Sequence, residues 1–263
     1  MSSLIRLAVS LGCVVATLAV EQKVEWKEAG KLAAEEAHQA AAADEQWVYA
    51  ITNNKVAKYD RKTGQRVAVS TGEAKHLNSG FLWEKQLLCA HSNFPNTPEQ
   101  SEIKTLDPET MKLTTFHDFG DFGGSLTWAV RHDQHWWCNF AKYGAKNAET
   151  FLVKFNDQWQ EQARWTYPQA VIRQIGTASL SGGIWHQNNL LVTDHDHPRL
   201  YRLRLPAEGT VLKFVEIQAI PFTGQGIADD PLTGGLVGIH RQQRQVLFAN
   251  PPAASQEKKT SSE

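Results

Sequence analysis

The sequence predicts an all-β protein with the architecture of a five-bladed β-propeller, and three observations lead to that prediction. Apolar runs of four to eight residues, separated by Gly, Asn, Asp and Pro clusters, recur along most of the chain. They group into units of about 40 to 55 residues with four strands each, which is the size of a propeller blade. Five such units account for the sequence up to Pro252, with the fourth strand of the last one supplied from elsewhere.

The clearest unit is Ser179 to Pro206, SLSGGIWHQNNLLVTDHDHPRLYRLRLP, which has the pattern of three consecutive strands with two tight connections. In four other segments a short polar or small-residue stretch precedes an apolar second strand in the same way. Those second strands are expected at 47–51, 87–91, 136–140 and 236–240. A third strand and usually a fourth follow each of them, as expected for a blade.

The last unit ends after its third strand, near Pro252, and lacks an outermost strand. The segment 23–32, KVEWKEAGKL, aligns with the fourth strands at 66–72 and 212–220. We therefore expect the N-terminal segment to complete the last blade, which removes an exposed sheet edge. The alternative is a helix over 23–37, because this segment is rich in Ala and Glu.

Residues 1–19 have the pattern of a secretory signal peptide: Arg6 near the start, an apolar run, and a small residue at Ala19. The run is too short to span a bilayer. Lipid attachment at Cys13 is an alternative that the surrounding residues fit poorly. We expect a domain over 20–252, a polar and disordered tail over 253–263, and a secreted or periplasmic protein.

The charge of the chain limits the partners that are expected, and its cysteines raise the question of a disulfide. The formal net charge is −1 with both signs interspersed, so nucleic acid is not expected as a partner. We expect a monomer without a membrane span.

Cys89 and Cys138 lie at equivalent positions of two second strands, where two buried free thiols are favoured over a disulfide.

A resemblance to known propellers rests on residues 48–65, VYAITNNKVAKYDRKTGQ. This V-Y…Y-D-x-x-T-G unit resembles the repeats of YVTN-type, PQQ-type and NHL-type propellers, and residues 107–111 hold a weaker version of its turn. The chain as a whole resembles exported bacterial propellers labelled cycloisomerases. The repeats imply a propeller but no particular activity, because propellers host both binding modules and enzymes.

The inner strand of each unit carries a neutral hydrogen-bonding side chain at one equivalent position: Gln39, Asn78, Thr127, Ser181 and Gln225. Because buried polar groups need partners, this ring predicts either a solvent-filled axial channel or a ring that satisfies its own hydrogen bonds. The ring contains no carboxylate, which argues against Ca²⁺ at this level.

Histidines concentrate at the starts of inner strands and the ends of second strands, which should meet at one face of the propeller. Six of the ten do so, at positions 38, 76, 91, 195, 197 and 240. Histidine exchanges protons near neutral pH and binds transition metals. Each one singly has the simpler role of a hydrogen-bonding residue near a turn, but together they predict a functional site at this face.

In the enzyme hypothesis, four histidines act as general acid or base, or bind one divalent metal ion: His76, His91, His195 and His240. Asp194 or Asp196 orients an imidazole, while Arg241 or Lys142 binds an anionic group. Asn78 or Asn93 polarises a carbonyl. Further expected substrate-binding residues are Gln39, Asn139, Ser181 and Gln225.

A lyase, a cycloisomerase or a lactone-type hydrolase acting on a small polar substrate would suit this set of residues. The sequence has no G-x-S-x-G, H-E-x-x-H or paired-cysteine zinc motif, so the standard nucleophile and metalloprotease classes have no support. The alternative is a non-catalytic propeller that binds carbohydrate or peptide at the same face. A scaffold for protein partners is a third possibility.

Overall fold

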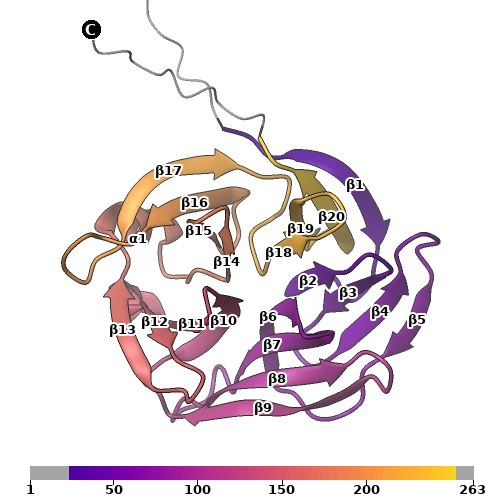
Figure 1. Cartoon of the computed structure of the whole chain (residues 1–263), viewed down its shortest axis with the longest axis horizontal. Coiled ribbons are helices and arrows are strands. Elements are labelled where there is room, and N and C mark those ends of the chain that lie inside the picture. Colours follow the sequence, from indigo (N-terminus) through magenta and orange to yellow (C-terminus); the bar gives the residue numbers. More distant parts are fainter. Residues whose placement is uncertain (1–23, 253–263) are drawn as a thin grey trace, which may run out of the picture.

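The computed structural model describes residues 24–252 of the 263. The predicted signal peptide at 1–19 and the predicted tail at 253–263 lie outside the described residues. Within 24–252, twenty strands form five four-stranded antiparallel sheets arranged as blades around a central axis (Figure 1). The prediction of an all-β, five-bladed β-propeller is confirmed.

Each blade is listed from its inner strand outward. Blade 1 holds β2 (Ala40–Ala43), β3 (Trp47–Ile51), β4 (Val56–Asp60) and β5 (Arg66–Val69). Blade 2 holds β6 (His76–Trp83), β7 (Gln86–Ser92), β8 (Ser101–Asp107) and β9 (Lys112–Gly120). Blade 3 holds β10 (Ser125–His132), β11 (His135–Ala141), β12 (Phe151–Phe155) and β13 (Glu161–Thr166). Blade 4 holds β14 (Gly182–His186), β15 (Asn189–Thr193), β16 (Arg199–Arg204) and β17 (Lys213–Ala219).

Blade 5 joins the two ends of the described chain. Its strands are β18 (Ala228–Asp230), β19 (Gly235–His240), β20 (Gln245–Asn250) and, outermost, β1 (Lys27–Ala33). The strand β1 runs antiparallel to β20, from the pair Lys27 and Asn250 to the pair Ala33 and Gln245 (Figure 1). The predicted N-terminal closure is confirmed and the helix over 23–37 is wrong. Pairing with β20 overrides the helix propensity of this Ala/Glu-rich segment.

Two short helices depart from the pure strand pattern. A 3₁₀ helix, η1 (Gly144–Glu149), follows β11, and α1 (Gln169–Ile175) connects blade 3 to blade 4. The helix α1 begins after Pro168 and buries Val171, Ile172 and Ile175. In the part of the chain that the structure describes, no helix has the length and apolar character needed to cross a membrane.

Buried aromatic side chains fill the space between blades. Trp128 of β10 is fully buried, and the position of Gly183 on β14 lies so close to its ring that an added Cβ would be 2.4 Å from it. Glycine at 183 is therefore what allows the indole to lie between blades 3 and 4. Cys89 and Cys138 are buried free thiols, as predicted.

Small residues let three blades approach one another closely near the starts of their inner strands. A Cβ added to Gly226 would lie 2.6 Å from the Cβ of Ala40 and 3.0 Å from the Cα of Ser79. Segments of blades 5, 1 and 2 thus touch at this level. The axis has two separate ends: the start mouth, where the inner strands begin, and the hairpin mouth, where they turn into the second strands.

Candidate functional site

The five-membered polar ring lies below the start mouth, and all five side chains are buried. Three of them donate hydrogen bonds to the backbone of a neighbouring blade. Asn78 Nδ2 donates to Leu126 O at 2.8 Å, and Thr127 Oγ1 donates to Leu180 O at 2.9 Å. Gln225 Nε2 donates to His195 O at 2.6 Å. These three bonds connect neighbouring blades, as expected for a ring that satisfies its own hydrogen bonds.

The central titratable group of the start mouth is His76, at the first position of β6. Its ring packs edge-on against Phe94, with centroids 5.4 Å apart. Burial, followed by the positive charges of His91 and Arg241, lowers the pKa of His76, while a hydrogen bond with Asn78 opposes the shift. The imidazole is therefore neutral near pH 7 and is able to accept a proton.

Arg241 supplies positive charge next to His76. Its Nη2 donates to Nε2 of His38 at 3.2 Å, and its backbone N–H donates to Thr223 Oγ1 at 2.9 Å. Burial lowers the pKa of the guanidinium, and burial together with the charges of Arg241 and Arg244 lowers that of His38. Within residues 24–252, no carboxylate oxygen lies within 4.0 Å of the Arg241 guanidinium, although the charge of Asp196 is near enough to oppose the lowering of its pKa. A half-buried cation of this kind is suited to bind an anion.

His195 is also close enough to His76 for its charge to act on that imidazole. Its Nδ1 lies 2.8 Å from Oδ2 of Asp196. Asp194, in contrast, is buried and accepts from the hydroxyl of Tyr201 at 2.9 Å, with Nδ1 of His197 at 2.9 Å from its other oxygen. Asp196 rather than Asp194 is thus the carboxylate that orients His195, and Asp194 holds the turn after β15 in place.

His91 has both ring nitrogens engaged. Its Nε2 accepts from the backbone N–H of Lys75 at 2.8 Å, and its Nδ1 lies 2.9 Å from Glu102 Oε1. Burial alone would raise the pKa of Glu102, but hydrogen bonds from His91, Thr115 and Lys104 lower it to about 2. His91 therefore has a structural role between β7 and β8. It is not free to serve as a base or a metal ligand in this arrangement.

Three other predicted site residues, His240, Asn93 and Asn139, form hydrogen bonds close to their own strands or loops. His240 Nδ1 accepts from the backbone N–H of Gln243 at 3.3 Å, within its own turn. Asn93 closes its loop by bonding to Pro98 O and Gln100 N, each at 2.9 Å. Asn139 is fully buried and accepts from the hydroxyl of Tyr167 at 2.6 Å. Each of these three thus has a hydrogen-bonding role within its own blade or loop.

Lys142 is at the rim of the start mouth, with Nζ 3.4 Å from Glu99 Oε2. Beside it, Tyr143 packs on Phe94 with ring centroids 4.7 Å apart, and burial raises the pKa of Tyr143 to about 12. Sequence reasoning did not single out Tyr143 or Phe94 as site residues, and it named His38 only as one of the six histidines at this face. Their signal was positional, since each directly follows a second strand or precedes an inner strand.

No group of three or more His, Cys, Asp or Glu side chains within residues 24–252 is arranged to hold a metal ion. Of the four predicted ligands, His91 has both ring nitrogens engaged, whereas His76, His195 and His240 do not. The predicted divalent metal remains a prediction.

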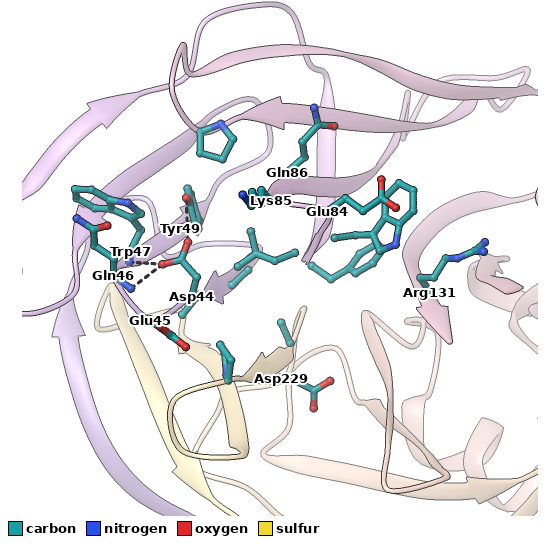
Figure 2. A pocket seen from close by; sticks show the side chains of 18 of the residues that line it. Asp44, Glu45, Gln46, Trp47, Tyr49, Glu84, Lys85, Gln86, Arg131 and Asp229 are labelled. Atoms are coloured by element: carbon teal, nitrogen blue, oxygen red, sulfur yellow. Dashed lines mark hydrogen bonds between the residues drawn. The ribbon is translucent and has the colours of Figure 1, made fainter. Parts of the chain in front are cut away.

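A larger hollow lies at the hairpin mouth, where sequence reasoning placed no site. It is a cavity of about 1160 Å³, lined by the ends of all five inner strands and by parts of blades 1 and 2 (Figure 2). Its wall holds both aromatic and acidic side chains, among them Trp47, Trp83, Trp185, Asp44, Glu84 and Asp229. The signal in the sequence was the Trp or Asp at the end of each of four inner strands.

Comparison with known proteins identifies the fold of the chain. No protein-family model and no curated protein match the sequence. Among solved structures, Myxococcus xanthus glutaminyl cyclase superposes with a TM-score of 0.60 at 8% identity, covering 89% of this chain and 100% of that one. A chain of the mitotic checkpoint complex reaches a TM-score of 0.49 at 9% identity, covering 94% and 99%. At such identities the likeness shows the propeller fold alone.

Proposed function

We propose that the start mouth is the active site of an enzyme that opens or closes a ring in a small, polar, anionic substrate. The reaction class is that of a lyase, a cycloisomerase or a lactone-type hydrolase. One observation carries the proposal: a neutral, half-buried imidazole, His76, lies within the influence of a half-buried guanidinium, Arg241, that forms no ion pair with a carboxylate within residues 24–252. A proton acceptor next to an anion-binding group is what such a reaction requires.

In the ring-opening direction, Arg241 binds a carboxylate of the substrate and His76 takes a proton from a water molecule. The water oxygen bonds to the lactone carbonyl carbon, and the ring C–O bond breaks. The departing oxygen takes a proton from His195, whose Nδ1 faces Asp196 at 2.8 Å. Ring closure is the reverse sequence, with the two histidines exchanging roles.

Two further observations support this reaction class. The solved structure with a TM-score of 0.60 is a glutaminyl cyclase, and the propeller fold of this chain covers its whole length. The resemblance of the chain to exported propellers labelled cycloisomerases indicates similar chemistry. No residue role is transferred from either. The assignment of the repeats to the YVTN, PQQ or NHL type and the secreted or periplasmic location remain predictions.

The experiment is a screen of small lactones that bear a carboxylate, with ring opening followed by proton release. His76→Ala and Arg241→Ala are compared with the parent protein, and His135→Ala in the β10–β11 hairpin is the matched control. We expect a loss of about 10²-fold or more in kcat/KM for His76→Ala, since general base catalysis contributes about that much. Arg241→Ala should raise KM, and His135→Ala should leave both constants unchanged.

Two results would contradict the proposal. One is turnover that His76→Ala leaves intact. The other is Arg241-dependent binding of anions or glycans without any turnover, which would make this mouth a binding module. Elemental analysis of the same proteins tests the metal: near-stoichiometric metal that is lost in His76→Ala and in His195→Ala would add a divalent ion to the site.

A further inference from the structure

The cavity at the hairpin mouth is distinct from the start mouth, because its lining does not include His76, His195 or Arg241. Its volume of about 1160 Å³ is ample for a small organic ligand. The cavity lies among the inner-strand ends and extends between blades 1 and 2, and its lining includes Asp44, Tyr49 and Lys85 (Figure 2). It is therefore a second candidate site with its own residues.

Negative charge predominates on the wall. Six lining residues carry carboxylates and three carry cations. Two of the three cations are already engaged by the protein. Lys58 Nζ donates to Pro108 O at 2.9 Å, and Arg131 Nη1 lies 2.5 Å from Asp157, which is not part of the wall. Lys85, in an exposed turn, is the remaining cation. The wall as a whole therefore attracts positive charge.

The carboxylates are spread over three blades rather than gathered in one cluster. Asp44 and Glu45 follow β2 of blade 1, and Glu84 follows β6 of blade 2. Asp229 lies in β18 of blade 5, with its Oδ1 3.0 Å from Nδ1 of His186. Asp44 uses Oδ1 to accept from the backbone N–H groups of Gln46 and Trp47, at 2.8 and 2.6 Å. Its Oδ2 is directed toward Tyr49, whose hydroxyl is 3.5 Å away, and toward the cavity (Figure 2).

Aromatic surface lies between these carboxylates. Trp47, Trp83 and Trp185 line the cavity on blades 1, 2 and 4. Lys58 shows how an alkylammonium fits this wall, because its Nζ lies 4.1 Å from the centre of the Trp47 ring. Aromatic faces attract cations in this geometry and also cover methylene groups. A ligand with several ammonium groups separated by methylenes would place its ammonium groups near the carboxylates and its methylenes against the rings.

From this arrangement we propose that the hairpin-mouth cavity binds a linear aliphatic polyamine. Its ammonium groups pair with Asp44, Glu84 and Asp229, and its methylene segments lie against the tryptophan rings. This binding site is independent of the ring-opening or ring-closing activity proposed for the start mouth.

The test is isothermal titration calorimetry of the folded protein with spermidine at low salt. We expect one site that weakens as NaCl is raised, since part of the attraction is electrostatic. The double variant Asp44→Asn, Glu84→Gln should raise the Kd about tenfold or more, because it removes two charged acceptors. Asparagine at 44 retains Oδ1 for the turn. Glu208→Gln, which removes an exposed carboxylate outside the cavity, is the matched control and should leave the Kd unchanged.

Three further measurements sharpen the result. Lys85→Gln should tighten spermidine binding, and Trp83→Leu should weaken it. His76→Ala and Arg241→Ala should not change it, which separates this site from the start mouth. The proposal is overturned by no binding at millimolar spermidine, by equal affinity of the double variant and the parent, or by a neutral disaccharide binding here while spermidine does not.

Discussion

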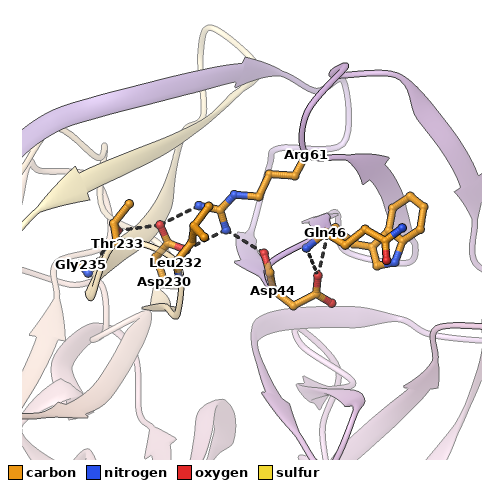
Figure 3. A network of polar contacts seen from close by, with 8 residues as sticks. Asp44, Gln46, Arg61, Asp230, Leu232, Thr233 and Gly235 are labelled. Carbon is orange, nitrogen blue, oxygen red and sulfur yellow. Dashed lines mark hydrogen bonds and ion pairs between the residues drawn. The ribbon is translucent and has the colours of Figure 1, made fainter.

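Asp230 and Arg61 form a bidentate ion pair, with Oδ1 and Oδ2 at 2.7 and 2.8 Å from the two terminal guanidinium nitrogens (Figure 3). Asp230 is fully buried at the end of β18 in blade 5, and Arg61 follows β4 in blade 1. The same guanidinium donates to Asp44 O at 2.7 Å. This pair therefore joins the first and last blades and holds the turn that carries Asp44 at the hairpin mouth.

Removing one partner of this pair leaves a buried charge without compensation. Asp230→Ala should lower the free energy of unfolding by about 3 to 5 kcal/mol, measured by urea denaturation. Arg164→Ala is the control, since its pair with Glu161 is exposed and should contribute about 1 kcal/mol or less. Equal effects of the two variants would show that the pair does not join the blades energetically.

Stability should fall with acidification. Burial alone would raise the pKa of Asp230, but hydrogen bonds from Arg61 and Thr233 lower it, and the pKa of Glu102 is about 2 against an ordinary value of 4.5. Because the pKa values of these two carboxyl groups are lower in the folded than in the unfolded state, the ionised carboxylates stabilise the fold above about pH 5. That stability is lost as the pH falls toward 2. Urea denaturation from pH 6 to pH 2 measures the slope. Glu102→Gln should flatten it, and an unchanged slope would contradict the assignment to Glu102.

The activity of the start mouth should depend on neutral His76. Because the pKa of His76 is lowered from 6.5, kcat/KM should be constant near pH 7 and decline on acidification below the ordinary value. The charge of Arg241 contributes to that lowering, so residual activity of Arg241→Ala should decline at a higher pH than that of the parent. A pH–rate profile that is the same in both proteins would argue against His76 as the base.

The contact at Gly226 should tolerate no side chain. In Gly226→Ala the new methyl group would meet Ala40 and Ser79 at 2.6 and 3.0 Å, so inner strands of three blades have to shift. We expect a loss of about 1 to 3 kcal/mol in unfolding free energy. Gly30→Ala in β1 is the control, because its added Cβ would lie 3.9 Å from Phe248, an ordinary contact. Thermal denaturation of the two variants measures this difference in stability.

Much of the fold was predictable because it depends on short-range pattern. Alternating strands and turn residues recur with a blade-length period, and the missing fourth strand of the last unit required β1. The same alignment brought His76, His195 and Arg241 toward one face. It did not distinguish Asp194 from Asp196, since both lie within two residues of His195 and only the buried hydroxyl of Tyr201 shows which carboxylate faces the core.

By itself, the sequence determined the number of blades, the closing strand and the face where histidines gather, because these follow from local strand and turn preferences repeated along the chain. The tertiary structure alone decided which polar groups meet. Arg241 reaches His38 across 203 positions, and Arg61 reaches Asp230 across 169. It also brought Gly226 into contact with Ala40 and Ser79 of two other blades, and it formed the acidic, aromatic cavity at the hairpin mouth. Such contacts depend on how blades distant in sequence pack against one another, which strand periodicity does not encode.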